Sequence, residues 1–168
     1  MLTDIAVIYD YHPRELLATR VGKLLESSVH RGIDVYRYDS EQDKEREYNW
    51  WTPNLRRFRQ KINSKKDYRF NVVLHSDNDH GPKLLVIPYG KQDKNETIRQ
   101  ISSVYDLLQA MRLDGRGISV APTIDQASVK FLPKGPGLID FELNEGKIKN
   151  PKEGYKLTTI GLYLLQHI

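Results

Sequence analysis

Two short segments far apart in the chain carry the residue types of a catalytic metal site. The segment YHPRE (11–15) places His12 and Glu15 three residues apart, and the segment VVLHSD (72–77) places His75 after an apolar run. Two imidazoles and one carboxylate are the ligand set of a catalytic zinc ion that keeps a further position open for water. The sequence therefore predicts that His12, Glu15 and His75 bind one zinc ion per chain.

A third segment, LIDFEL (138–143), supplies the base that such chemistry requires. An acidic side chain on an otherwise apolar strand must face something polar or a metal ion, and Glu142 is such a residue. A carboxylate near a zinc ion can deprotonate a water molecule and later protonate the leaving group. We expect Glu142 to be this base. Asp140 shares its face on a regular strand, so the two carboxylates could exchange roles.

The pattern of apolar residues indicates the strands and helices that must position these side chains. Short apolar runs and alternating segments predict strands, and apolar residues at helical spacing predict helices. We expect strands at 5–9, 33–38, 70–74, 83–88, 118–121 and 138–143. Helices are expected at 13–26, with Pro13 in the first helical position, and at 54–62, 96–112 and 157–168. A helix between the first two strands makes them parallel.

Strands interspersed with helices predict an α/β fold. We expect residues 1–168 to form a single three-layer domain with a mostly parallel central sheet flanked by helices. In such sheets ligands bind outside the carboxyl ends of the strands. His12, His75 and Glu142 each lie at or near such an end. This placement predicts that the three segments meet in space.

The order of these motifs resembles the zinc carboxypeptidase superfamily, and most closely its succinylglutamate desuccinylase/aspartoacylase branch. His12-x-x-Glu15 is followed by His75 and then by Glu142 on a late strand. The segment IDFEL (139–143) is similar to the family's Thr-x-Glu-hydrophobic strand. The segment NLRRF (54–58) is similar to its Asp-Leu-Asn-Arg segment.

The resemblance implies a zinc carboxypeptidase-like fold and zinc-dependent hydrolysis of an amide bond next to a carboxylate. The substrate would be a small anionic amide or peptide, such as an N-acyl amino acid or the end of a peptide. Glu142 would activate the water bound to zinc, and Arg57 would grip a substrate carboxylate or stabilise the oxyanion. Arg14, which matches the family's His-x-Arg-Glu form, and Arg56 would help to bind the substrate.

Composition limits the other possibilities. The chain has 26 basic and 22 acidic residues and no cysteine, so disulfides and thiolate metal sites are excluded. Its basic residues are dispersed apart from 56–61 and 65–66, which argues against a nucleic-acid interface. The N-terminus does not have the pattern of a signal peptide, and no apolar run reaches the ~20 residues that span a bilayer. We therefore expect a cytoplasmic protein without a membrane partner, and the oligomeric state stays open.

An alternative function remains open at this point. The chain could be a noncatalytic α/β module that binds an anionic ligand through Arg56, Arg57 and Arg59. It could also bind nucleic acid, with Trp50 and Trp51 as a stacking surface. These two tryptophans could equally be core anchors or one wall of a pocket. His80 is a reserve metal ligand or proton donor.

Overall fold

The computed structural model describes residues 4–12, 14–38, 53–78, 81–89, 106, 109, 112–120 and 137–167. Trp50, Trp51 and His80 lie outside these ranges, and so does most of the helix expected at 96–112. Within the described ranges, no helix combines the length and the apolar character needed to cross a membrane.

Six strands form one sheet with the order β2-β1-β3-β6-β4-β5. The strands are β1 (Ile5–Tyr9), β2 (Ile33–Arg37), β3 (Phe70–Asp77), β4 (Leu84–Tyr89), β5 (Ile118–Val120) and β6 (Gly137–Asn144). β1 is parallel to β2 and β3, β3 is parallel to β6, and β4 is parallel to β5. Only the pairing of β4 with β6 is antiparallel among these contacts. The predicted mostly parallel sheet is confirmed, and β2 and β5 lie at its two edges.

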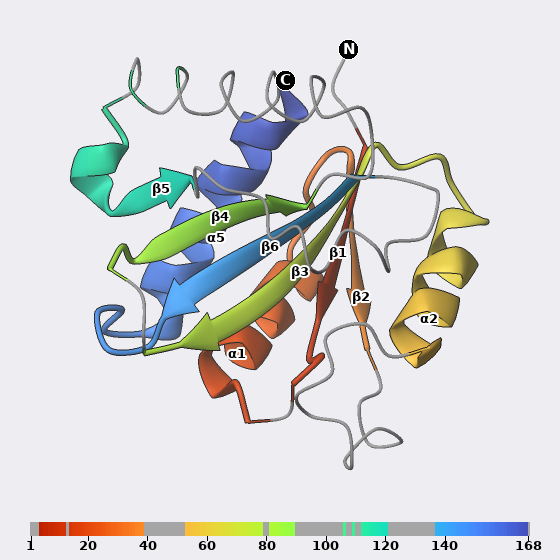
Figure 1. Ribbon diagram of the computed structural model, residues 1–168, viewed down its shortest axis with the longest axis horizontal. Coiled ribbons are helices and arrows are strands. Elements are labelled where there is room, and N and C mark those ends of the chain that lie inside the picture. The colour runs from red at the N-terminus through yellow and green to blue at the C-terminus, as the bar shows by residue number, and fades with distance from the viewer. Residues whose placement is uncertain are drawn as a thin grey trace.

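Helices cover both faces of this sheet, which gives the three expected layers (Figure 1). Helices α1 (Leu16–Glu26) and α5 (Pro151–Gln166) pack on one face around Val72, Leu74 and Phe141. Helix α2 (Pro53–Asn63) packs on the other face through Leu55 and Ile62. A short 3-10 helix, η2 (Asp114–Arg116), precedes β5. The α/β layered fold class is therefore confirmed.

One glycine allows α1 to approach β1 closely. A Cβ atom at Gly22 would lie 2.2 Å from Cγ of Tyr9, which is closer than real side chains allow. The helix backbone thus lies directly against the last residue of β1. This contact fixes the start of α1 relative to the carboxyl end of that strand.

Alternate side chains of β3 and β6 point to opposite faces of the sheet, one covered by α1 and α5 and the other by α2. Side chains in a strand point alternately to opposite faces. On β6, Ile139, Phe141 and Leu143 belong to the core beneath α1 and α5, whereas Leu138 belongs to the core beneath α2. The α2 face therefore receives Asp140 and Glu142 from β6, and His75 from β3 in the same way. Parallel register pairs His75 with Glu142.

Candidate metal centre

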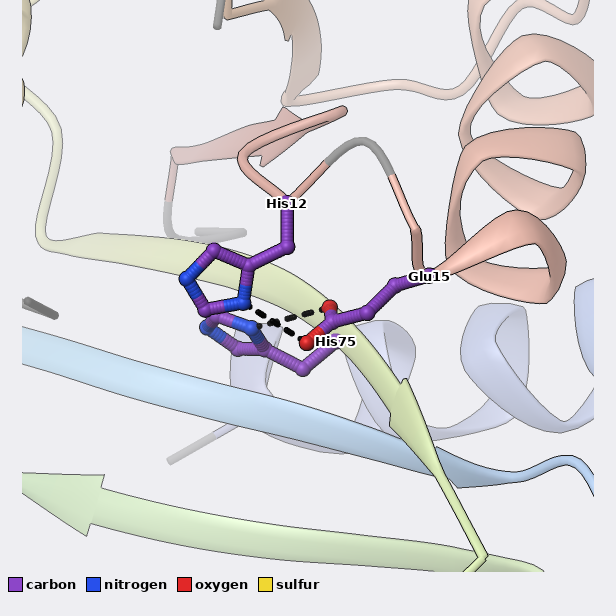
Figure 2. A group of neighbouring side chains, drawn as sticks. All are labelled: His12, Glu15 and His75. Carbon is purple, nitrogen blue, oxygen red and sulfur yellow. Dashed lines mark hydrogen bonds and ion pairs between the residues drawn. The ribbon is translucent and has the colours of Figure 1, made fainter. Parts of the chain in front are cut away.

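Three side chains from two separated segments converge at the carboxyl edge of the sheet. The Glu15 carboxylate lies between two imidazoles, with Oε1 2.7 Å from Nδ1 of His12 and Oε2 3.2 Å from Nδ1 of His75 (Figure 2). The two imidazole ring centroids are 5.2 Å apart. One possible ligand atom from each residue lies within 4.8 Å of the others. The chain thus brings together the three residues that the sequence singled out, and their role as metal ligands stays a prediction.

The start of α1 differs from the sequence expectation. The helix begins at Leu16, so His12 and Glu15 lie in the preceding turn and not on one helix face. Asp10 has a positive φ of 63°, which bends the chain as it leaves β1. Glu15 is the residue just before the helix, and its carboxylate accepts a hydrogen bond from the backbone N–H of Ser76 (3.2 Å). The expected helical arrangement is wrong because contacts with the end of β3 fix Glu15 outside the helix.

The first turn of α1 is capped by residues from distant strands. The hydroxyl of Ser76 accepts a hydrogen bond from the backbone N–H of Ala18 (3.1 Å), and Glu145 accepts one from Leu17 (3.3 Å). Ser76 also donates to Glu145 (2.7 Å). Unsatisfied N–H groups at a helix start need such partners. Because the same segment of β3 carries His75, this cap ties Glu15 to its partner imidazole.

Sequence reasoning missed Ser76 and Glu145. Both follow strand residues that the sequence did single out, at the edge where the carboxyl ends of parallel strands meet. Their polar side chains at that edge were a usable signal. Their pairing with α1 spans 58 and 128 positions of the chain, so no local pattern reports it.

The electrostatic state of His75 follows from its buried partners. The side chain is only 2% exposed, and Nε2 lies 3.7 Å from Oδ1 of Asp140. Burial acts to lower the pKa of His75, but Asp140 and Glu15 outweigh it and raise the pKa to about 10. At 3.7 Å the contact with Asp140 is a charge interaction and not a strong hydrogen bond. The imidazole is thus held between two carboxylates, which favour its protonated form in the metal-free protein.

The pKa of Glu15 is shifted in the direction opposite to that of His75. Burial alone would raise the pKa of its carboxyl group. Hydrogen bonds with His12 and His75 outweigh this effect and lower the pKa to about 2. A carboxylate that stays ionised between two imidazoles is suited to bind a divalent cation, which can take the place of protons on the imidazole nitrogens.

Further carboxyl groups line the same face of the sheet. Glu142 is 8% exposed, and Asp140 is 2% exposed. Burial raises the pKa of Glu142 to about 8, with a side-chain hydrogen bond to Asp77 adding to the effect. The neighbouring His75 acts in the opposite direction. A base and an acid with perturbed pKa values next to a possible metal site are typical of catalytic centres.

Aromatic rings form a wall between the imidazoles and α2. The ring of Tyr11 lies 4.6 Å from that of His12 and 6.0 Å from that of His75, measured between centroids. Tyr38 lies edge-on to Tyr11 at 5.2 Å and also to Phe58 of α2 at 5.2 Å. Tyr11 and Tyr38 are both almost fully buried. These rings exclude water from one side of the site.

The roles of Arg14, Arg56 and Arg57 in substrate binding stay predictions. Arg57 and Arg14 are exposed, and the side chain of Arg56 lies outside the described residues. Arg59 is instead buried, at 2% exposure, and donates from Nε to Oδ1 of Asn71 (3.0 Å). Burial lowers the pKa of Arg59 to about 10, although the charge of Asp140 opposes this shift.

The inward face of α2 explains this difference. Leu55, Arg59 and Ile62 recur at helical spacing and are buried, which leaves Arg57 on the outer side. The same spacing can be read in the sequence, where it points to Arg59, and not Arg57, as the arginine on the buried side of the helix. Of the alternative cluster of Arg56, Arg57 and Arg59, the buried Arg59 and the exposed Arg57 lie on different sides of α2, and binding of an anion by Arg56 or Arg57 stays a prediction.

A surface hollow of about 540 Å³ lies elsewhere, beside β2 and the end of α2. Residues around it include Tyr36, Tyr68, Lys65 and Lys66, and none of the three candidate ligands lines it. We place the chemistry at the triad because the ionisable groups converge there.

The donor set fits a zinc ion. Two histidines and one carboxylate match the three protein ligands of open catalytic zinc sites. The three residues are half-buried or buried, and the short contacts of Glu15 with both rings show that their donor atoms face a common point.

Comparison with known proteins identifies structural neighbours. No protein-family model and no curated protein matches the sequence. The fold is similar to the CwlD amidase from Clostridioides difficile, solved in complex with the GerS lipoprotein, with a TM-score of 0.53 and 16% identity over 98% of this chain and 97% of that one. An N-acetylmuramoyl-L-alanine amidase from Clostridium difficile 630 has a TM-score of 0.49 and 14% identity over 98% and 95% of the two chains. At 16% identity the likeness to the CwlD amidase shows a common fold.

The resemblance to the zinc carboxypeptidase superfamily, including its aspartoacylase branch, is wrong. The chain instead shares its fold with the CwlD amidase. The motifs that suggested the resemblance are short, and ligands from the carboxyl ends of parallel strands produce the same residue order in unrelated α/β proteins. The segment matched to the family's Asp-Leu-Asn-Arg lies on α2, where Arg57 is exposed.

Proposed function

We propose that this protein is a zinc-dependent hydrolase of amide bonds. The observation that carries the proposal is the convergence of His12, Glu15 and His75 within 4.8 Å of one another beside a buried acidic residue. A zinc ion bound by this triad would polarise a substrate carbonyl and lower the pKa of a water molecule. The fold shared with the CwlD amidase supports hydrolysis of an amide.

Glu142 is the proposed general base. It neighbours His75 in the parallel register of β3 and β6, and it lies nearer the carboxyl edge than Asp140. Its carboxylate would take a proton from the attacking water and deliver it to the leaving nitrogen. Burial raises its pKa to about 8 in the metal-free protein. A cation nearby favours the ionised form that a base requires.

The substrate is proposed to be an amide that links an acyl group to an amino acid or peptide. The neighbour named as an N-acetylmuramoyl-L-alanine amidase makes muramoyl peptides the first substrates to assay. N-acyl amino acids form the second set.

The test compares Glu142→Gln with the wild type. We expect this variant to keep one zinc ion per chain and to hydrolyse these substrates about 10²- to 10⁴-fold more slowly, because it loses only the proton acceptor. Zinc content is measured by elemental analysis of protein purified without a histidine tag, and hydrolysis by release of the free amine.

His75→Ala serves as the matched loss-of-metal variant. It removes one of the three ligands and should lose both zinc and activity. Wild-type protein that binds no zinc would refute the proposal, and a Glu142→Gln variant with full turnover would remove Glu142 as the base.

A further inference from the structure

We propose that Asp140 is a positioning residue that holds the Nε2 proton of His75 and thereby directs Nδ1 to the metal. This inference rests on the proposed zinc site and assigns Asp140 a role distinct from that of the base. The two carboxylates of β6 would then act on different atoms of the site.

The two nitrogens of His75 face different carboxylates. Nδ1 lies 3.2 Å from Glu15, on the side of the triad, and Nε2 lies 3.7 Å from Asp140. His75 and Asp140 are both 2% exposed, so water has little access to compete for either group. The ring is thus oriented by a fixed negative charge at the end that points away from Glu15.

Sheet register separates Asp140 from Glu142. Val73 pairs with Asp140, and His75 pairs with Glu142, so Asp140 lies one side-chain pair further from the carboxyl edge on the same face. A substrate entering from that edge meets Glu142 before Asp140. The position of Asp140 suits support of the ring and not proton transfer to a substrate.

The surroundings of Asp140 show that its charge is compensated by ionic partners. Its Oδ2 atom is buried without a hydrogen-bond partner among the described residues. A buried carboxylate is costly unless cations offset it. The imidazole of His75 lies 3.7 Å from Asp140, and the buried guanidinium of Arg59 on α2 is a cation that interacts electrostatically with Asp140. Asp140 is therefore held between the imidazole and a fixed arginine.

Imidazole chemistry links this geometry to the metal. A histidine binds a metal through one nitrogen only when that nitrogen is deprotonated, and the other nitrogen commonly donates to a carboxylate. With its proton retained at Nε2 by Asp140, His75 presents the lone pair of Nδ1 towards Glu15 and His12. Loss of such a partner typically weakens metal binding about 10- to 100-fold.

The first experiment measures zinc affinity by competition with a chelating dye. Asp140→Asn is compared with Glu142→Gln, since each variant replaces one carboxyl group on the same face of β6 by an amide of the same shape. We expect zinc affinity to fall about 10- to 100-fold in Asp140→Asn and to stay near the wild-type value in Glu142→Gln. Equal affinity in Asp140→Asn and the wild type would overturn the inference. Wild-type protein without zinc would instead refute the proposed function.

The second experiment uses the wild type and therefore does not depend on the folding of a variant. Long-range ¹⁵N–¹H spectra of the zinc-loaded protein report which nitrogen of His75 carries the proton. We expect the proton at Nε2 and the metal at Nδ1. The opposite tautomer would overturn the assignment of Asp140, whatever its variants do.

Discussion

Single side chains decide the electrostatics of this site because most of the charged groups are buried. Glu15 is the residue on which both imidazoles converge, and its ionised state is stabilised by hydrogen bonds with both. On the opposite side of His75, Asp140 is balanced by Arg59. The site therefore alternates negative and positive groups from α1 to α2, and removal of one leaves its neighbour uncompensated.

Arg59 provides a test of this alternation. In Arg59→Lys the ammonium group cannot reproduce the planar donor geometry that reaches Asn71. We expect the free energy of unfolding to fall by about 1.5–3 kcal/mol, the value of a hydrogen bond to a charged group. Chemical denaturation measures the change. Arg57→Lys, two positions away on the exposed side of α2, is the matched control and should change stability little; equal losses would show that Arg59 is not specially held.

At the scale of elements, the contact between α1 and the ends of β3 and β6 determines the site. Helix α1 does not cap itself, and Ser76 and Glu145 supply the acceptors for its first turn. Because Glu15 immediately precedes this turn, the cap positions a candidate ligand. Helix stability and ligand geometry are therefore coupled at the same few atoms.

Ser76→Ala tests this coupling. Loss of the hydroxyl removes an acceptor for Ala18 and should destabilise the protein by about 1 kcal/mol, as for other helix caps. It should also weaken zinc binding, because the helix start next to Glu15 loses a contact with β3, while the hydrogen bond from the backbone N–H of Ser76 to Glu15 remains. Ser28→Ala is the control, since that hydroxyl donates to Leu24 at the opposite end of α1. Zinc affinity that falls equally in both variants would contradict the coupling.

The edge strand β2 offers a pH-dependent contact away from the metal site. Asp34 is partly buried, which acts to raise the pKa of its carboxyl group, but hydrogen bonds from Tyr68 (2.7 Å) and Lys66 (3.0 Å) lower it. A lowered folded-state pKa stabilises the protein above the ordinary pKa, and this contribution disappears as the pH falls through the folded value. The side chain is 43% exposed, so the contribution is small.

We expect Asp34→Asn to cost up to about 1 kcal/mol at neutral pH and nearly nothing at about pH 2. Urea unfolding at both pH values measures the difference. Asp4→Asn removes a second carboxylate partner of Lys66 and is the matched control. A cost for Asp34→Asn that grows as the pH falls would contradict the sign of this prediction.

At the scale of the whole molecule, the architecture followed from the sequence further than the chemistry did. Continuous apolar runs predicted β1, β3 and β6, and their parallel arrangement placed His12, His75 and Glu142 at one edge. The antiparallel position of β4 was not predicted, since strand order depends on contacts between distant residues. The Ser76–Glu145 cap was missed for the same reason, whereas the buried position of Arg59 could have been inferred from the helical periodicity of α2. Short motifs also misassigned the family, because this sheet geometry can arise in different families.

The central claim is that one zinc ion binds between His12, Glu15 and His75. X-ray absorption at the zinc edge of stoichiometrically loaded protein tests it most directly. We predict two imidazole nitrogens and at least one carboxylate oxygen at about 2.0–2.2 Å from zinc. In His75→Ala, any zinc ion that is still bound should have one imidazole ligand fewer. Failure to load one equivalent of zinc, or a zinc environment without imidazole nitrogen, would contradict this account.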